Sequence, residues 1–237
     1  MNNLKKIIVD DKIINYISKK YKLLKQDYQW KIPSIDNFDC SGESTYQANV
    51  KLKKYFNLTY NECKNIQEQI IIAKLIIKKW GRIYGTQEKT IKEFIKNFNS
   101  LKTFPHKNVS SYSKLYSMID LDNYAIYDSR VAACLNALQL NLRIKEGYVF
   151  NYINGRNNII GNSRKKIGFT QIKKFNEKNI SKDENWIRIE KVDNYKFYLD
   201  YINKIKKVLD IELYDIEMIL FSDAENQCIQ IMQKNNY

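Results

Sequence analysis

Two residues of opposite charge stand close together in the chain, each where a helix is expected. Lys114 lies in the segment "SSYSKLYSMI" (110–119), and Asp128 lies in "NYAIYDSRVAACLNALQ" (123–139). Lys114 falls in the first turns of one predicted helix. Asp128 opens the next predicted helix, after a short apolar stretch. An amine and a carboxylate brought together in this way would form a pair of nucleophile and acid/base.

Each of these residues also has a simpler explanation when it is taken alone. Aspartate is a favoured N-cap residue, because its carboxylate accepts hydrogen bonds from free helix amides and complements the helix dipole. Arg130 would pair with Asp128 or with a phosphate, and Lys114 is one lysine among many. The joint arrangement of the lysine helix, the apolar stretch and the aspartate helix is what favours catalysis.

The elements that must position this pair are predicted to be helical. Apolar residues recur at a helical period through most of the chain, and Pro33, Gly42, Gly81 and Gly85 interrupt the pattern. We expect helices at 4–25, from Ser44 or Thr45 to 56, at 59–80, at 88–99 and at 110–119. Further helices are expected from Asp128 onward, at 193–209 and at 213–221. In the last of these, Asp215 and Glu217 are expected to face outward. Four aromatic residues are expected in the core: Tyr195, Phe197, Tyr198 and Tyr201.

One stretch departs from the helical pattern. Residues 146–168 are rich in Gly and Asn, which predicts an irregular loop or a small hairpin. Its basic residues, Arg156, Arg164, Lys165 and Lys166, belong either to a solvated loop or to a clamp on an anionic backbone. The fold predicted is all-α, with one domain over 1–237; a division into two lobes with a cleft near 106–130 stays open.

Composition narrows the class of partner. The chain has 237 residues, 44% of them hydrophobic, and a net charge of +14, which favours a polyanion such as DNA, RNA or an anionic membrane surface. The abundance of Lys, Asn, Ile and Tyr is also what a low-GC genome produces by codon drift. No two of the four cysteines have CxxC spacing, so no metal site is expected. With neither a signal peptide nor a membrane span in the pattern, we expect a cytoplasmic protein.

The two segments together resemble the helix-hairpin-helix superfamily of DNA glycosylases, which includes endonuclease III and the 8-oxoguanine glycosylases. In that family a hairpin leads into a helix bearing a lysine in bifunctional members. An apolar stretch then ends in an essential aspartate. Lys114 takes the lysine position and Asp128 the aspartate position, and the resemblance covers roughly residues 60–145. Ser110, Ser111 and Tyr112 stand where the family hairpin has glycines.

The resemblance implies that the enzyme extrudes a damaged or modified base from double-stranded DNA and removes it. Asp128 would stabilise positive charge on the sugar, and Lys114 would form a Schiff base that permits strand cleavage. If Lys114 points elsewhere, Asp128 would activate water instead. Neither route needs a metal or a cofactor. The DNA contacts expected besides those of the basic loop are His106, Lys107, Ser110, Ser111, Tyr112, Ser129 and Arg130.

Two other functions stay open at this stage, as does the oligomeric state. One is a nucleic-acid-binding module that keeps the architecture without catalysis. The other is a helical partner-binding protein whose basic charge reflects its genome. Trp80 is expected to pack in the core, with a base-stacking wall as the alternative.

Overall fold

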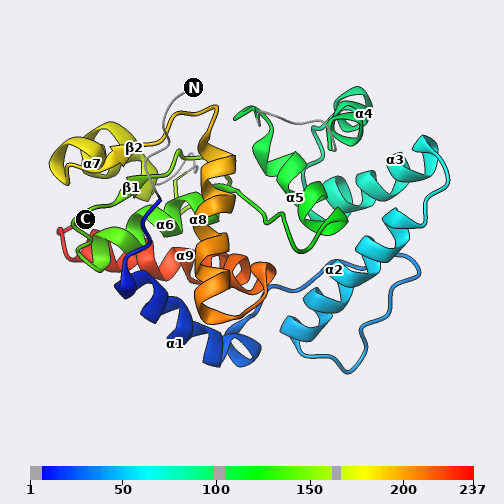
Figure 1. Cartoon of the computed structure of the whole chain (residues 1–237), viewed down its shortest axis with the longest axis horizontal. Helices are drawn as coiled ribbons and strands as arrows, with labels where there is room; N and C mark the ends of the chain where they lie inside the picture. Colours follow the sequence, from blue (N-terminus) through cyan, green and yellow to red (C-terminus); the bar gives the residue numbers. More distant parts are fainter. Residues whose placement is uncertain (1–6, 99–104, 162–166) are drawn as a thin grey trace.

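Helices make up most of the regular structure in the residues that the computed structural model describes, which are 7–98, 105–161 and 167–237. The all-α prediction is confirmed (Figure 1). In chain order the elements are α1 (Asp11–Asp27), α2 (Thr45–Asn61), α3 (Ile66–Lys74), the π-helix η1 (Leu75–Trp80), α4 (Glu88–Asn97), α5 (Val109–Ile119), α6 (Ser129–Asn141), β1 (Tyr148–Val149), the 3-10 turns η2 (Phe169–Gln171) and η3 (Lys173–Phe175), α7 (Glu177–Asp183), β2 (Ile187–Arg188), α8 (Asn194–Leu209) and α9 (Leu213–Gln233).

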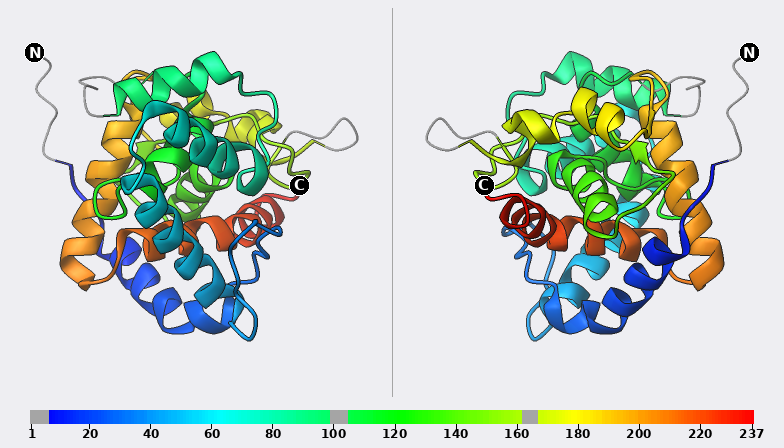
Figure 2. Two further views of the ribbon diagram at one scale, coloured as in Figure 1. Left: turned by 90° about the vertical axis from the view of Figure 1, so that its right-hand side faces the viewer. Right: turned by 90° about the vertical axis from the view of Figure 1, so that its left-hand side faces the viewer.

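Helices α6 and α9 pack along each other and form the centre of the molecule. In Figure 1, α2 to α5 lie to the right of this pair, α7 lies to its left and α1 lies below it. The two turned views of Figure 2 show α6 directly above α9 from both directions. None of the described helices is both long enough and apolar enough to cross a bilayer.

The core is unusually rich in tyrosine. The four aromatic residues of α8 that we expected inside are buried, which confirms that prediction: Tyr195, Phe197, Tyr198 and Tyr201. A buried tyrosine needs a hydrogen-bond partner for its hydroxyl group. Several of these hydroxyls find one on the backbone near the candidate site, as described below.

Polar caps explain where several of the helices begin. Asp10 accepts a hydrogen bond from the amide of Lys12 at 2.8 Å, so α1 begins at residue 11, later than the predicted start at residue 4. Ser44 forms a capping box with Gln47 and starts α2 as expected. Asn65 caps α3, and the helix predicted to begin near 59 therefore begins at residue 66.

The last helix differs most from the prediction. It continues to residue 233, well beyond the predicted end at 221. Asp215 and Glu217 were expected to face outward, and this is wrong, because both side chains are buried. The hydroxyl of Tyr46 donates to Asp215 at 2.7 Å, and Lys53 pairs with Glu217 at 3.0 Å. These partners on α2 allow carboxylates to lie inside the protein.

The irregular stretch at 146–168 contains no hairpin in its described part. Its one strand, β1, pairs in parallel with β2, which lies far along the chain. The loop that follows β1 is held to α6 by Asn136, whose amide group exchanges two hydrogen bonds with the backbone of Phe150 at 2.8 and 3.0 Å. A long irregular segment is thereby fixed beside the middle of α6.

Candidate active site

Lys114 and Asp128 face each other. The Nζ atom of Lys114 lies 3.1 Å from Oδ2 of Asp128, and the two side chains are 11% and 14% exposed. The pair therefore lies mostly inside the protein while keeping an opening to solvent. The structure brings together the amine and the carboxylate that the sequence placed on neighbouring helices.

Asp128 uses its two oxygens for different purposes. Oδ1 accepts from the backbone amides of Arg130 at 3.0 Å and Val131 at 3.3 Å, and so caps α6. Oδ2 faces Lys114. The capping role and the paired role, which are alternatives in the sequence, are both present. The cap also fixes the orientation of the carboxylate relative to the lysine.

Lys114 owes its position to a close approach by Gly81. A Cβ atom added to Gly81 would lie 2.9 Å from Cδ of Lys114 and 2.8 Å from the carbonyl oxygen of Ile77. Gly81 ends the π-helix η1, and its amide donates to the carbonyl of Ile76 at 2.8 Å, five residues back. The absence of a side chain at this position leaves room for the stem of the lysine.

Ser113 ties the lysine helix to the segment that carries the aspartate. Its Oγ accepts from the backbone amide of Tyr127 at 3.1 Å and donates to the Tyr127 carbonyl at 3.3 Å. Ser113 directly precedes Lys114, and Tyr127 directly precedes Asp128. These two hydrogen bonds therefore fix the backbones beside both members of the pair.

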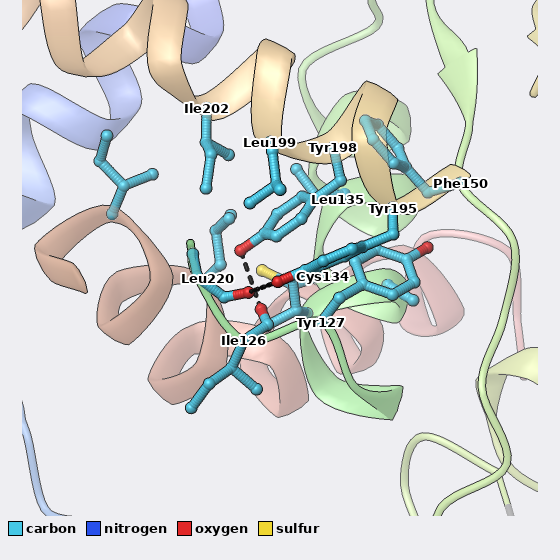
Figure 3. Packing of buried hydrophobic residues seen from close by; sticks show 14 of the residues in the cluster. Ile126, Tyr127, Cys134, Leu135, Phe150, Tyr195, Tyr198, Leu199, Ile202 and Leu220 are labelled. Atoms are coloured by element: carbon cyan, nitrogen blue, oxygen red, sulfur yellow. Dashed lines mark hydrogen bonds between the residues drawn. The ribbon is translucent and has the colours of Figure 1, made fainter. Parts of the chain in front are cut away.

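Two tyrosines from α8 hold the same segment from its other side. Tyr195 donates to the carbonyl of Ala125 and Tyr198 donates to the carbonyl of Ile126, each at 2.9 Å. Figure 3 shows both hydroxyls pointing toward the strand-like run before α6. Because this extended run has no sheet partner among the described residues, side chains satisfy its backbone groups.

The pair lies in the wall of a cavity of about 700 Å³. The cavity is lined from both sides of the molecule, by residues that follow η1 and by residues of α5, α6 and α9. Its aromatic lining includes Tyr28, Trp30, Trp80 and Phe221, and its cationic lining includes Arg82, Arg130 and Arg156. An apolar wall with a few charged groups is typical of a ligand site.

Arginines surround Trp30 in this cavity. The guanidinium carbons of Arg82 and Arg130 lie 5.8 and 5.9 Å from the Trp30 ring centroid, and Phe221 meets Trp30 edge-on at 5.0 Å. Arg130 pairs with Glu225, so its side chain is not the partner of Asp128. The indole thus lies between cationic side chains in the cavity lining.

The remaining predicted DNA contacts divide into two groups. Ser110, Ser129, Arg130 and Arg156 line the cavity together with the pair. Ser129 packs so closely on Gly155 that an added Cβ there would lie 2.0 Å from the serine Oγ.

The other predicted contacts lie away from the cavity lining. Lys107 is exposed, His106 is half-buried, and burial lowers the pKa of the His106 imidazole. The side chains of Ser111 and Tyr112 are buried and bonded inside the protein, to Thr86 and to the Pro105 carbonyl, so they are not presented to a ligand. Arg164, Lys165 and Lys166 lie outside the described residues.

The cavity contains residues that the sequence analysis did not select. Tyr28 and Trp30 come from the segment after α1, Arg82 follows η1, and Glu217 comes from α9. The one signal available for Tyr28 and Trp30 was the presence of large aromatic residues where the helical pattern stops. Arg82 has a positive φ of 54°, a conformation that sequence pattern does not reveal in an arginine.

Within the described part of the chain, no cluster of three or more His, Cys, Asp or Glu side chains could hold a metal ion. All four cysteines are free; Cys134 and Cys228 are buried, whereas Cys40 and Cys63 are half-buried.

Comparison with known proteins finds no match to this chain among family models, curated proteins or solved structures. A functional assignment therefore rests on the residues of the cavity themselves.

Proposed function

We propose that the protein is a DNA glycosylase with lyase activity on abasic sites. The observation that carries this proposal is the 3.1 Å contact between Lys114 and Asp128 in the wall of an aromatic and cationic cavity. A paired amine and carboxylate supply a nucleophile and a group that stabilises positive charge. The resemblance of the two segments to helix-hairpin-helix glycosylases supports the same assignment.

Asp128 acts first in this proposal. Loss of a base from deoxyribose leaves positive charge on the sugar, and a fixed carboxylate beside that sugar stabilises the charge. The hydrogen bonds from the α6 amides hold the carboxylate in one orientation. No reorganisation of Asp128 is then needed as the charge develops.

Lys114 completes the reaction. Once its ammonium has lost a proton to solvent, the neutral amine attacks C1′ of the sugar while Asp128 stays ionised, and the base leaves with the electrons of the glycosidic bond and takes a proton from solvent. The new secondary ammonium then gives a proton to Oδ2 of Asp128, and that proton passes to the ring oxygen as the bond from C1′ to this oxygen breaks, which forms the Schiff base and restores the carboxylate. Loss of a C2′ proton expels the 3′ phosphate and cleaves the strand.

The cavity lining suits a flipped nucleotide. Aromatic side chains line the cavity, Trp30 among them, and stacking on such side chains stabilises an unpaired base. Arg82 and Arg156 are exposed at the cavity and carry positive charge that attracts the flanking phosphates. This division between aromatic and cationic groups supports a nucleic-acid substrate.

Borohydride trapping on DNA with an abasic site tests the proposal. The wild-type protein is expected to form a covalent adduct, and Lys114→Ala is expected to abolish it. Lys196→Ala removes an exposed lysine of α8 outside the cavity and is the matched control. Asp128→Asn keeps the cap but removes the charge, and we expect it to slow trapping by at least about a hundredfold.

Two results would contradict the proposal. One is a wild-type protein that forms no adduct, and the other is an adduct that persists in Lys114→Ala. Tight DNA binding without any adduct would instead support the non-catalytic binding module.

A further inference from the structure

Glu217 presents a carboxylate oxygen to the cavity with nothing bound to it. The side chain is 3% exposed and lines the cavity. Its Oε2 accepts from Nζ of Lys53 at 3.0 Å and from the amide of Ile126 at 3.4 Å. Its Oε1 has no hydrogen-bond partner among the described residues, and it is not sealed from the cavity.

Among the described residues, Tyr28 also has a side-chain oxygen without a hydrogen-bond partner in the same cavity. The residue is 5% exposed, and its hydroxyl has no hydrogen-bond partner in the described part of the chain. Burial, together with the charges of Glu217 and Asp128, raises the pKa of Tyr28 well above its ordinary value. The hydroxyl is therefore protonated at neutral pH and available as a donor.

Asp223, another buried carboxylate of α9, shows what full pairing looks like in this protein. Both oxygens of Asp223 are occupied, Oδ1 by Lys20 and Asn226 and Oδ2 by Tyr16 and Gln227. Oε1 of Glu217 and the Tyr28 hydroxyl both reach the cavity, where a ligand with matching groups would complete their hydrogen bonds.

We propose that Glu217 and Tyr28 select the base that the cavity accepts. Oε1 of Glu217 accepts a hydrogen bond from an N–H group on the edge of the base, and the Tyr28 hydroxyl donates to the neighbouring ring nitrogen or carbonyl oxygen. Lys53 balances the charge of Glu217 through Oε2, which leaves Oε1 for the ligand. This inference rests on the proposed function, because it assigns the substrate class of the same cavity.

The predicted substrate class follows from this pattern. A base that presents an N–H donor beside an acceptor fits both groups. A base whose corresponding edge carries only acceptors would place lone pairs against a carboxylate, which costs free energy. A base methylated at that nitrogen would lose the bond to Glu217 as well.

Two small molecules that differ by one amino group test the selection. The fluorescent base 9-methyl-2-aminopurine has an exocyclic N–H donor beside a ring nitrogen, and 9-methylpurine lacks the donor. Fluorescence titration measures the first, and competition against it measures the second. We expect the amino compound to bind the wild-type protein about tenfold more tightly, as one hydrogen bond to a charged group implies.

Variants at the two residues should give different signatures. Glu217→Gln keeps an oxygen toward Lys53 and turns an N–H₂ group toward the cavity, so the preference for the amino compound should disappear. Tyr28→Phe removes the bond to the ring nitrogen that both compounds share, so both affinities should fall by about tenfold while their ratio stays. Tyr214→Phe, a half-buried tyrosine of α9 outside the cavity, is the matched control.

The result can contradict this inference without touching the proposed function. Equal affinity for the two compounds, no saturable binding up to about 10 mM, or unchanged binding in Tyr28→Phe would overturn it. Glu217→Gln leaves Lys53 without its charge partner, so thermal unfolding must show that this variant is folded. If Glu217→Gln is unfolded, the affinities of Tyr28→Phe for the two compounds decide whether the inference holds. Trapping on abasic DNA needs no base, so its failure would remove the glycosylase proposal alone.

Discussion

At the scale of single residues, the site depends on the absence of a Cβ atom at Gly81. Gly81 has no side chain where Lys114 passes, and the backbone of η1 closes the space around it. A catalytic amine works only when it is held at the right distance from the reacting atom. The lysine is thus positioned by a residue that takes no part in the chemistry.

The substitution Gly81→Ala should therefore impair trapping. The new methyl group would lie 2.9 Å from Cδ of Lys114 and would displace the side chain. We expect the rate of borohydride trapping to fall by about tenfold to a hundredfold, because small displacements of reacting groups are costly. Gel quantification of the adduct over time measures this rate.

Gly85→Ala is the control for this substitution, since an added Cβ there has nothing within 4 Å among the described residues. Equal trapping rates for Gly81→Ala and the wild-type protein would show that Lys114 does not depend on the space at Gly81.

At the scale of elements, the site is a junction of α5, α8 and the run before α6. The extended residues before Asp128 form no strand pair in the described structure, and hydroxyls from the two helices take the place of one. Ser113 is the member of this set that lies next to Lys114. Without the Ser113 hydroxyl, the distance between Lys114 and Asp128 would vary more.

Ser113→Ala should lower both stability and trapping. The substitution leaves the buried amide of Tyr127 without its partner, which lowers the free energy of unfolding by about 1–3 kcal/mol. Urea unfolding measures the first effect, and borohydride trapping at a temperature where the variant is folded measures the second.

Ser117→Ala is the matched control on the same helix, because the Ser117 hydroxyl bonds only the carbonyl of Lys114, at 3.0 Å. We expect it to change trapping little. If Ser113→Ala trapped abasic DNA as fast as Ser117→Ala, the positioning role of Ser113 would have to be abandoned.

At the scale of the whole molecule, part of the net charge of +14 lies around the cavity. The cavity gathers arginines at its surface and keeps its carboxylates in pairs with lysines. The exposed arginines of the lining are therefore the groups whose contribution to DNA binding can be tested directly.

Binding to duplex DNA should weaken steeply with salt. Each phosphate contact contributes about one unit to the slope of log affinity against log salt, so Arg82→Ala should reduce that slope by about one. Fluorescence anisotropy with a duplex carrying a stable abasic analogue measures the slope. Lys182→Ala, on α7 outside the cavity, should leave it unchanged; an identical slope in Arg82→Ala would argue against phosphate contact there.

The sequence predicted the helices and the proximity of Lys114 to Asp128 because both depend on local spacing. Apolar periodicity and caps such as Ser44 act within one helix, and Lys114 and Asp128 are only 14 residues apart. Burial of Glu217 could not be predicted, because its partner Lys53 lies 164 residues away. Tyr28 was missed for the same reason, since only the fold brings the end of α1 beside α9.

The π-helix η1 makes the cavity wall sensitive to the deletion of a single residue. A π-helical turn bonds five residues back, where an α-helix bonds four, so it holds one residue more than the regular helix. Deleting a single codon between 75 and 80 would restore the regular helix and turn Trp80 and Gly81 away from their present directions. A substitution within the turn leaves this residue count unchanged, so a change in its length alters the direction of the wall in a way that a point change does not.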